Sequence, residues 1–134
     1  MARAYLLRAG EGLDGDPSLK ASRASTTGSL TLIESDTDGG APPHVHERED
    51  EAMYVLDGEI SVRCGANRWS APRGAFVFMP RGEEHEWDVI GDRAVVLIVA
   101  SPAGLEEFLA EFHSAPDWAA RDAVAARFGL TFPR

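Results

Sequence analysis

The sequence predicts one mostly β domain that ends in a short helical tail. Between about Ala4 and Ala100 the apolar runs are short and are interrupted by Gly, Pro, Asn or Asp, which is typical of many short strands. After Ala100 apolar residues recur at helical spacing instead. The length of 134 residues fits a single domain. We therefore expect residues 1–100 to form a β-barrel domain and residues 101–134 to form a C-terminal helical extension of it.

Composition and charge narrow the classes of partner. The net charge of -9 argues against nucleic acid, because a phosphate backbone requires a basic surface. No apolar run approaches the roughly 20 residues that span a bilayer, so no membrane partner is expected. Cys64 is the only cysteine and the chain starts without a signal-peptide pattern, which indicates the cytoplasm. The expected partner is a small molecule.

The turn residues divide the β region into its expected strands. The loop 34–43 is rich in turn residues, and its Pro42-Pro43 pair holds the chain extended ahead of His44. Asp57-Gly58 stands between two apolar runs and predicts a two-residue hairpin turn. A second hairpin is expected around 65–67, and the Pro and Gly residues of 72–82 exclude a helix there.

Two helices are expected in the tail. Ser101-Pro102 offers a cap and a first-turn proline, and Glu106 and Glu107 follow where the helix dipole favours acids. The second helix is predicted from the capping pattern Ser114-x-x-Asp117, with Gly129 as its C-terminal stop.

Three histidines and one glutamate form the candidate site. His44 and His46 are two residues apart, so on a strand both imidazoles project to the same face. A turn through 47–50 would bring Glu51 inward on the next strand, and His85 begins a later strand after the Pro80–Glu84 turn. Three imidazoles and one carboxylate leave an octahedral ion two open positions, which suits a metal that binds substrate directly.

Each of these residues also has a plainer interpretation. A lone histidine is more often hydrogen-bonded than metal-bound, and Cys64 is expected to be a small buried apolar residue. The acids Glu47, Glu49 and Asp50 are expected to form a solvated turn. The apolar strand neighbours of the site are expected to line a pocket in the barrel interior: Met53, Val55, Phe76, Phe78, Trp87 and Val89.

The spacing of these residues resembles the two motifs of the cupin superfamily. In the first motif, His44-Val-His46 is followed by four residues, Glu51, six residues and Gly58. In the second, Gly74, Pro80, Gly82 and His85 match at every spacing. The motifs cover about 39–89. Two departures are that Gly39 and Gly40 lie closer to His44 than the family's first glycine, and that Val89 stands where the family often has Asn.

The resemblance implies a double-stranded β-helix, the jelly-roll barrel of cupins. It implies one divalent transition metal ion per chain, Fe, Mn, Ni, Cu or Zn, held by His44, His46, Glu51 and His85. The tail sequence "SPAGLEEFLAEF" resembles that of small bacterial cupins described as quercetin dioxygenase-like, which are often homodimers. A homodimer is therefore expected.

Three functions remain open at this point. The first is a dioxygenase acting on a small apolar or aromatic, flavonol- or enol-like compound, with Glu51 as a catalytic group that accepts the substrate proton. The second is a zinc-dependent polyketide cyclase or isomerase in which the ion stabilises an enolate. The third is a non-catalytic cupin that binds a small molecule.

Overall fold

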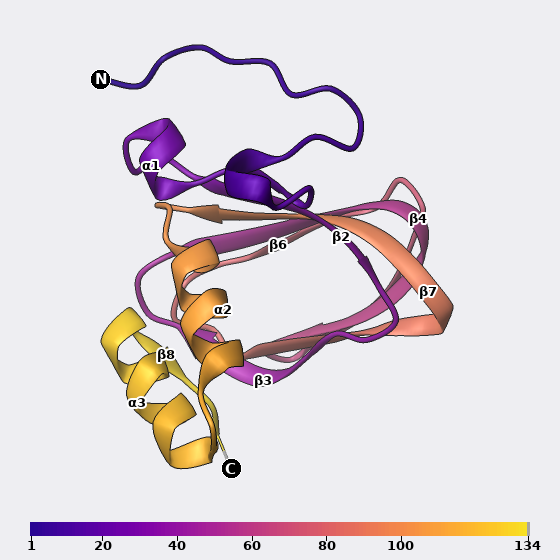
Figure 1. Ribbon diagram of the computed structural model, residues 1–134. Coiled ribbons are helices and arrows are strands. Elements are labelled where there is room, and N and C mark those ends of the chain that lie inside the picture. Colours follow the sequence, from indigo (N-terminus) through magenta and orange to yellow (C-terminus); the bar gives the residue numbers. More distant parts are fainter. Residues whose placement is uncertain (134) are drawn as a thin grey trace.

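The fold is a two-layered β-barrel with a C-terminal helical tail, as the sequence predicts (Figure 1). The computed structural model describes residues 1–133. The strands are β1 (Leu19–Ala21), β2 (Thr31–Thr37), β3 (Ala41–His46), β4 (Asp50–Cys64), β5 (Asn67–Pro72), β6 (Phe76–Met79), β7 (His85–Ser101) and β8 (Leu130–Thr131). The helical elements are η1 (Leu13–Gly15), α1 (Arg23–Thr26), α2 (Leu105–Ser114) and α3 (Trp118–Phe128).

Two long strands, β4 and β7, each contribute to both layers. In one layer residues 50–55 of β4 pair with 96–101 of β7, and β6, β2 and β1 extend the layer on either side. In the other layer residues 59–64 of β4 pair with 85–90 of β7, and β5, β3 and β8 complete it. All of these pairs are antiparallel. This arrangement, in which long antiparallel strands contribute to two packed sheets, is a jelly roll.

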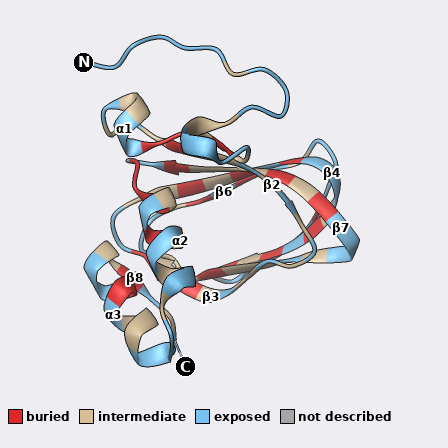
Figure 2. Cartoon of the chain, in the orientation of Figure 1, coloured by how far each residue is buried: buried red, intermediate tan, exposed pale blue. Residues whose placement is uncertain are grey.

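The main core lies between the two layers. Alternate residues of β4 point inward, so Met53, Val55, Ile60 and Val62 are buried while the residues between them are more exposed. Buried residues run along β4 and β7 in Figure 2. This core supports the inward-facing polar residues of the site.

The predicted hairpin at Asp57-Gly58 is wrong. β4 runs through this pair without reversing, and its pairing with β7 shifts register between Val55 and Asp57 and again between Asp57 and Glu59. Gly58 adopts a positive φ of 78°, and here that conformation produces a β-bulge that bends the strand from one layer into the other. The second expected hairpin is confirmed, because Cys64 pairs with Asn67 across Gly65-Ala66.

The tail contains two helices, but the first begins later than predicted. Ser101 still belongs to β7, where it pairs with Asp50, so it stays extended and cannot cap a helix. α2 starts at Leu105 instead, with Glu106 and Glu107 in its first turn. α3 is capped by the side chain of Asp117, which accepts a hydrogen bond from Ala120 N at 2.8 Å, and it ends at Gly129 in the left-handed conformation.

The tail returns to the barrel. β8 pairs with β3 at Val45–Thr131 and His46–Leu130, so α2 and α3 lie at one end of the two layers, beside β3 (Figure 1). Leu105, Phe108, Val124, Ala125 and Leu130 form a second buried cluster with Ala100. Within residues 1–133 no helix has the length and apolar character needed to cross a lipid bilayer.

Candidate metal centre

Two imidazoles of the site come from one strand. His44 and His46 occupy alternate positions of β3 and point inward, with 5% and 2% of their surface exposed. Val45, between them, is only partly buried. The local pattern predicted from the His-x-His spacing is therefore present.

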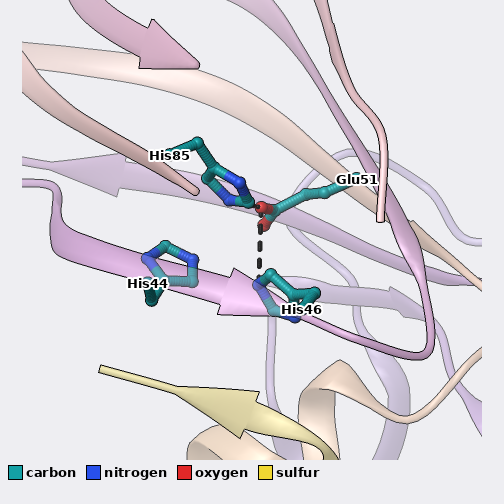
Figure 3. Close-up of side chains that lie close together, drawn as sticks. All are labelled: His44, His46, Glu51 and His85. Atoms are coloured by element: carbon teal, nitrogen blue, oxygen red, sulfur yellow. Dashed lines mark hydrogen bonds and ion pairs between the residues drawn. The ribbon is translucent and has the colours of Figure 1, made fainter. Parts of the chain in front are cut away.

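The other two side chains come from the long strands. His85 is the first residue of β7 and pairs directly with His44 on β3. Glu51 lies near the start of β4, which pairs with β6 and β7 rather than with β3. All four side chains are buried, and one ligand atom from each lies within 4.8 Å of the others. In Figure 3 the four side chains converge from β3, β4 and β7.

The outer ring nitrogen of each histidine has an acceptor outside the cluster. His44 Nδ1 lies 2.7 Å from Pro42 O, and His85 Nδ1 lies 3.3 Å from Glu83 O. His46 Nδ1 lies 2.5 Å from the Oε1 atom of Glu49. Because carbonyl and carboxylate oxygens accept hydrogen bonds, the three Nδ1 atoms carry the protons. The three Nε2 atoms are then the ones available to an ion, as in most histidine metal sites.

The charges in the cluster suit a cation. Burial and the neighbouring His85 lower the pKa of His44 to about 4, so this imidazole is neutral near pH 7. Burial favours the protonated form of Glu51, but the hydrogen bond to His85 and the nearby imidazoles outweigh it and lower the pKa of Glu51. For His46 burial again opposes the charged form, and the hydrogen bond to Glu49 outweighs it and raises the pKa of His46. Glu51 is therefore a buried carboxylate that requires positive charge beside it.

The donor set fits a divalent transition metal. His85 Nε2 lies 2.7 Å from Glu51 Oε2, and His46 Nε2 lies 3.7 Å from the same oxygen. An ion that binds both groups would replace the direct contact between them. Three nitrogens and one oxygen suit iron, manganese, nickel, copper or zinc, and they do not select among these metals.

A cavity of about 270 Å³ gives access to the cluster. His44, His46 and Glu51 line it at the metal end. Its other walls are mostly apolar and come from β2, β3, β7 and α2, and from the β8 end of the tail. A separate, more polar groove of about 660 Å³ includes Arg63, Arg68 and Asp88 and none of the four candidate ligands.

The predicted pocket residues fall into three groups. Trp87 lines the cavity. Met53 and Val55 are fully buried in the barrel core, and Val89 packs against that core, so these three support the barrel rather than line the cavity. Phe76 and Phe78 were expected to line the interior and do not: they are 64% and 53% exposed and line a groove on the outside. Val77 and Met79 occupy the inward positions of β6.

Sequence reasoning missed two groups of residues around the site. The first is Glu49, expected to be a solvated turn residue, whose side chain is only 12% exposed because it contacts His46. The second is the aromatic part of the tail, where Phe108, Phe112 and Phe132 line the cavity. The helical spacing of the tail indicates an apolar face but not which part of the barrel that face covers. For Glu49 the only available signal is its position three residues after His46.

The chain is similar to a known protein family and to a protein of another organism. Residues 31–101, more than half of the chain, match the family described as the cupin domain. An uncharacterized protein of Streptomyces coelicolor, SCO3923, is 29% identical over 73 residues, which cover 54% of this chain and 67% of that protein.

Solved structures share the fold. The chain is similar to KdgF from Halomonas sp. with a TM-score of 0.56 and 21% identity, over 72% of this chain and 92% of that one. It is also similar to TT1209 from Thermus thermophilus with a TM-score of 0.52 and 28% identity, over 56% and 74% of the two chains. The fold of these structures agrees with the barrel described above.

Proposed function

The chain belongs to the cupin domain family, and we propose that it is a metal-dependent dioxygenase that acts on a small, largely apolar, enol-like or aromatic compound. The observation that carries the proposal is the buried cluster of three imidazoles and one carboxylate that lines an apolar cavity. A purely structural ion needs a closed site, whereas four protein ligands leave a six-coordinate ion open to substrate.

The proposed roles follow from the positions of the side chains. His44, His46, Glu51 and His85 would hold a redox-active divalent ion, which when bound stabilises an ionised substrate oxygen and supports oxygen transfer. Glu51 is the group that accepts the substrate proton, at Oε2, because its carboxylate is ionised and lines the cavity.

The cavity walls have a second role. Ile33, Ile98 and Leu105 are among the apolar residues that face the bound compound. Such walls exclude water, which strengthens the electrostatic interactions of the reacting oxygen and protects reactive species from hydrolysis.

The test combines metal analysis with oxygen uptake. The protein, purified without a chelating column, is expected to contain about one iron, manganese, nickel or copper per chain. It should consume oxygen with at least one member of a panel of flavonols and cyclic enols. His85→Ala should lose both properties. His113→Ala should keep the metal, since His113 lines the cavity from α2 but is exposed and is not one of the four ligands.

Two outcomes would overturn the dioxygenase. Zinc at the same stoichiometry with turnover of an enolisable substrate in the absence of oxygen would establish a cyclase or isomerase instead. Failure to bind any of the five metals would remove the metal site and leave a non-catalytic binding protein.

A further inference from the structure

Aromatic rings of the tail adjoin an imidazole of the metal cluster. The ring of Phe132 stacks on His44 with a centroid distance of 5.7 Å and an interplanar angle of 27°. Phe132 also stacks on Phe112 at 5.1 Å and 18°. Phe108 lies 6.5 Å from Phe132 at 21°. The metal end of the cavity therefore adjoins an aromatic wall made by Phe108, Phe112 and Phe132.

The barrel holds this wall in place. Leu130, two residues before Phe132, is 5% exposed and pairs with His46 through β8 and β3. The loop after β3 is bound to the end of α3, because Glu47 N donates to Gly129 O at 2.8 Å and Arg48 Nη1 donates to Arg127 O at 2.8 Å. The segment that carries Phe132 is thus positioned relative to His44 and His46 by hydrogen bonds to β3 and to the loop after it.

The wall lies outside the part of the chain that defines the family. The cupin domain match ends at residue 101, whereas the aromatic wall begins at Phe108. The four candidate ligands therefore lie within the residues that match the family, and the aromatic wall lies outside them.

The charge of the cavity restricts its ligand further. Glu51 is the only acidic residue among those that line it, and none of these lining residues is Lys or Arg. A ligand can therefore place one anionic group at the metal, while the remainder should be uncharged. Aromatic side chains at the cavity wall favour a planar, unsaturated remainder, because aromatic rings pair through offset-stacked or edge-to-face contacts.

We propose that Phe112 and Phe132 determine specificity by selecting planar, unsaturated ring compounds that bind the metal through an oxygen-bearing group. The inference rests on the proposed metal site, and it adds the residues that choose the shape of the compound bound there. Both residues are placed to contact the ligand rather than to take part in the reaction.

The test uses three hydroxamic acids that share one metal-binding group, titrated calorimetrically into the protein loaded with nickel, which accepts six ligands. Benzohydroxamic acid carries a flat ring, cyclohexanecarbohydroxamic acid carries a puckered ring of similar size, and acetohydroxamic acid carries no ring. We expect the wild type to bind the benzo compound about tenfold more tightly than the cyclohexane compound, since aromatic contacts of this kind favour flat rings by about this factor.

Phe132→Leu and Phe112→Leu should each reduce this preference to about twofold and leave the affinity for acetohydroxamic acid unchanged. That unchanged affinity shows that the fold and the metal site survive the substitution. The matched control is Phe76→Leu, on the outer face and 64% exposed, which should keep the full preference.

The outcomes separate this inference from the proposed function. If acetohydroxamic acid binds and the two ring compounds bind equally, the aromatic wall does not select planar ligands and the inference fails alone. A tenfold preference that persists in both leucine variants would also overturn it. If the protein takes up no nickel, or if acetohydroxamic acid does not bind, the accessible metal site fails and the inference fails with it.

Discussion

Glu49 shows how a residue outside the metal-ligand motif can control a ligand. Its Oε1 atom lies 2.5 Å from His46 Nδ1, and its side chain is 12% exposed. A carboxylate in this position fixes the tautomer and the ring orientation of the histidine and makes its other nitrogen a stronger ligand. Glu49 is thus a positioning residue for His46.

We expect Glu49→Ala to weaken metal binding by roughly 10–100-fold, the usual effect of losing such an outer partner. Glu49→Gln should recover part of the loss, because its amide oxygen still accepts the hydrogen bond without the charge. Zinc affinity is measured by competition with a chromogenic chelator. Glu47→Ala is the control, since Glu47 is exposed and is not one of the four candidate ligands. Equal affinities in wild type and Glu49→Ala would refute the positioning role.

Residue spacing predicts the four candidate ligands but not their surroundings. The parity of a strand places His44 and His46 on one face wherever the strand lies. The alternation of side chains along a strand does not show which residues of β6 point into the barrel, because all four residues of that strand, Phe76–Met79, are apolar. The same limit applies to Glu49, whose contact depends on how the loop after β3 folds back.

At the scale of elements, the bulge at Gly58 joins the two layers. A Cβ atom at this position would lie 2.6 Å from Arg93 O, and φ is 78°. The residue therefore has to be glycine both for its conformation and for the close approach of β7. The Asp-Gly pair correctly predicts a residue with positive φ. Whether the chain reverses there or continues as a bent strand depends on the long-range pairing of β4 with β7, which the local sequence does not show.

We expect Gly58→Ala to lower the free energy of unfolding by at least about 2 kcal/mol, through left-handed strain and displacement of β7. Gly91→Ala is a matched control, since Gly91 has φ of 92° with nothing within 4 Å of its added Cβ. The control should lose only about 1 kcal/mol, the strain alone. Urea unfolding gives both values. Equal losses would show that the approach of Arg93 O has no energetic consequence.

At the scale of the molecule, the barrel is predictable from the sequence and the position of the tail is not. Two motifs with matching spacing identify the jelly roll, and the cupin family match covers the residues from β2 to the end of β7. The tail helices are visible as local periodicity and capping residues. Their packing on β3, which places Phe132 on His44, depends on tertiary contacts between segments far apart in the chain.

The outer face of β6 and the neighbouring part of β4 expose large apolar side chains. Tyr54, Phe76 and Phe78 are 42%, 64% and 53% exposed, and Tyr54 pairs with Phe76 on neighbouring strands. Among the described strands β6 pairs only with β4, so its other edge is open. An exposed apolar face beside an open strand edge is typical of a protein–protein interface. We propose that this face joins two copies of the chain in a homodimer.

Light scattering should therefore give twice the chain mass of 14.5 kDa. The double substitution Phe76→Ser and Phe78→Ser should give the monomer mass, because it removes the largest apolar side chains of the face. Ile90→Ser, at a residue of β7 that is 41% exposed, should leave the dimer intact. Each chain carries a net charge of -9, so the two copies repel, and added salt should strengthen the dimer by screening that repulsion. A monomeric wild type at high salt would rule out this interface, whereas a dimer that survives the double substitution would place the contact elsewhere on the barrel.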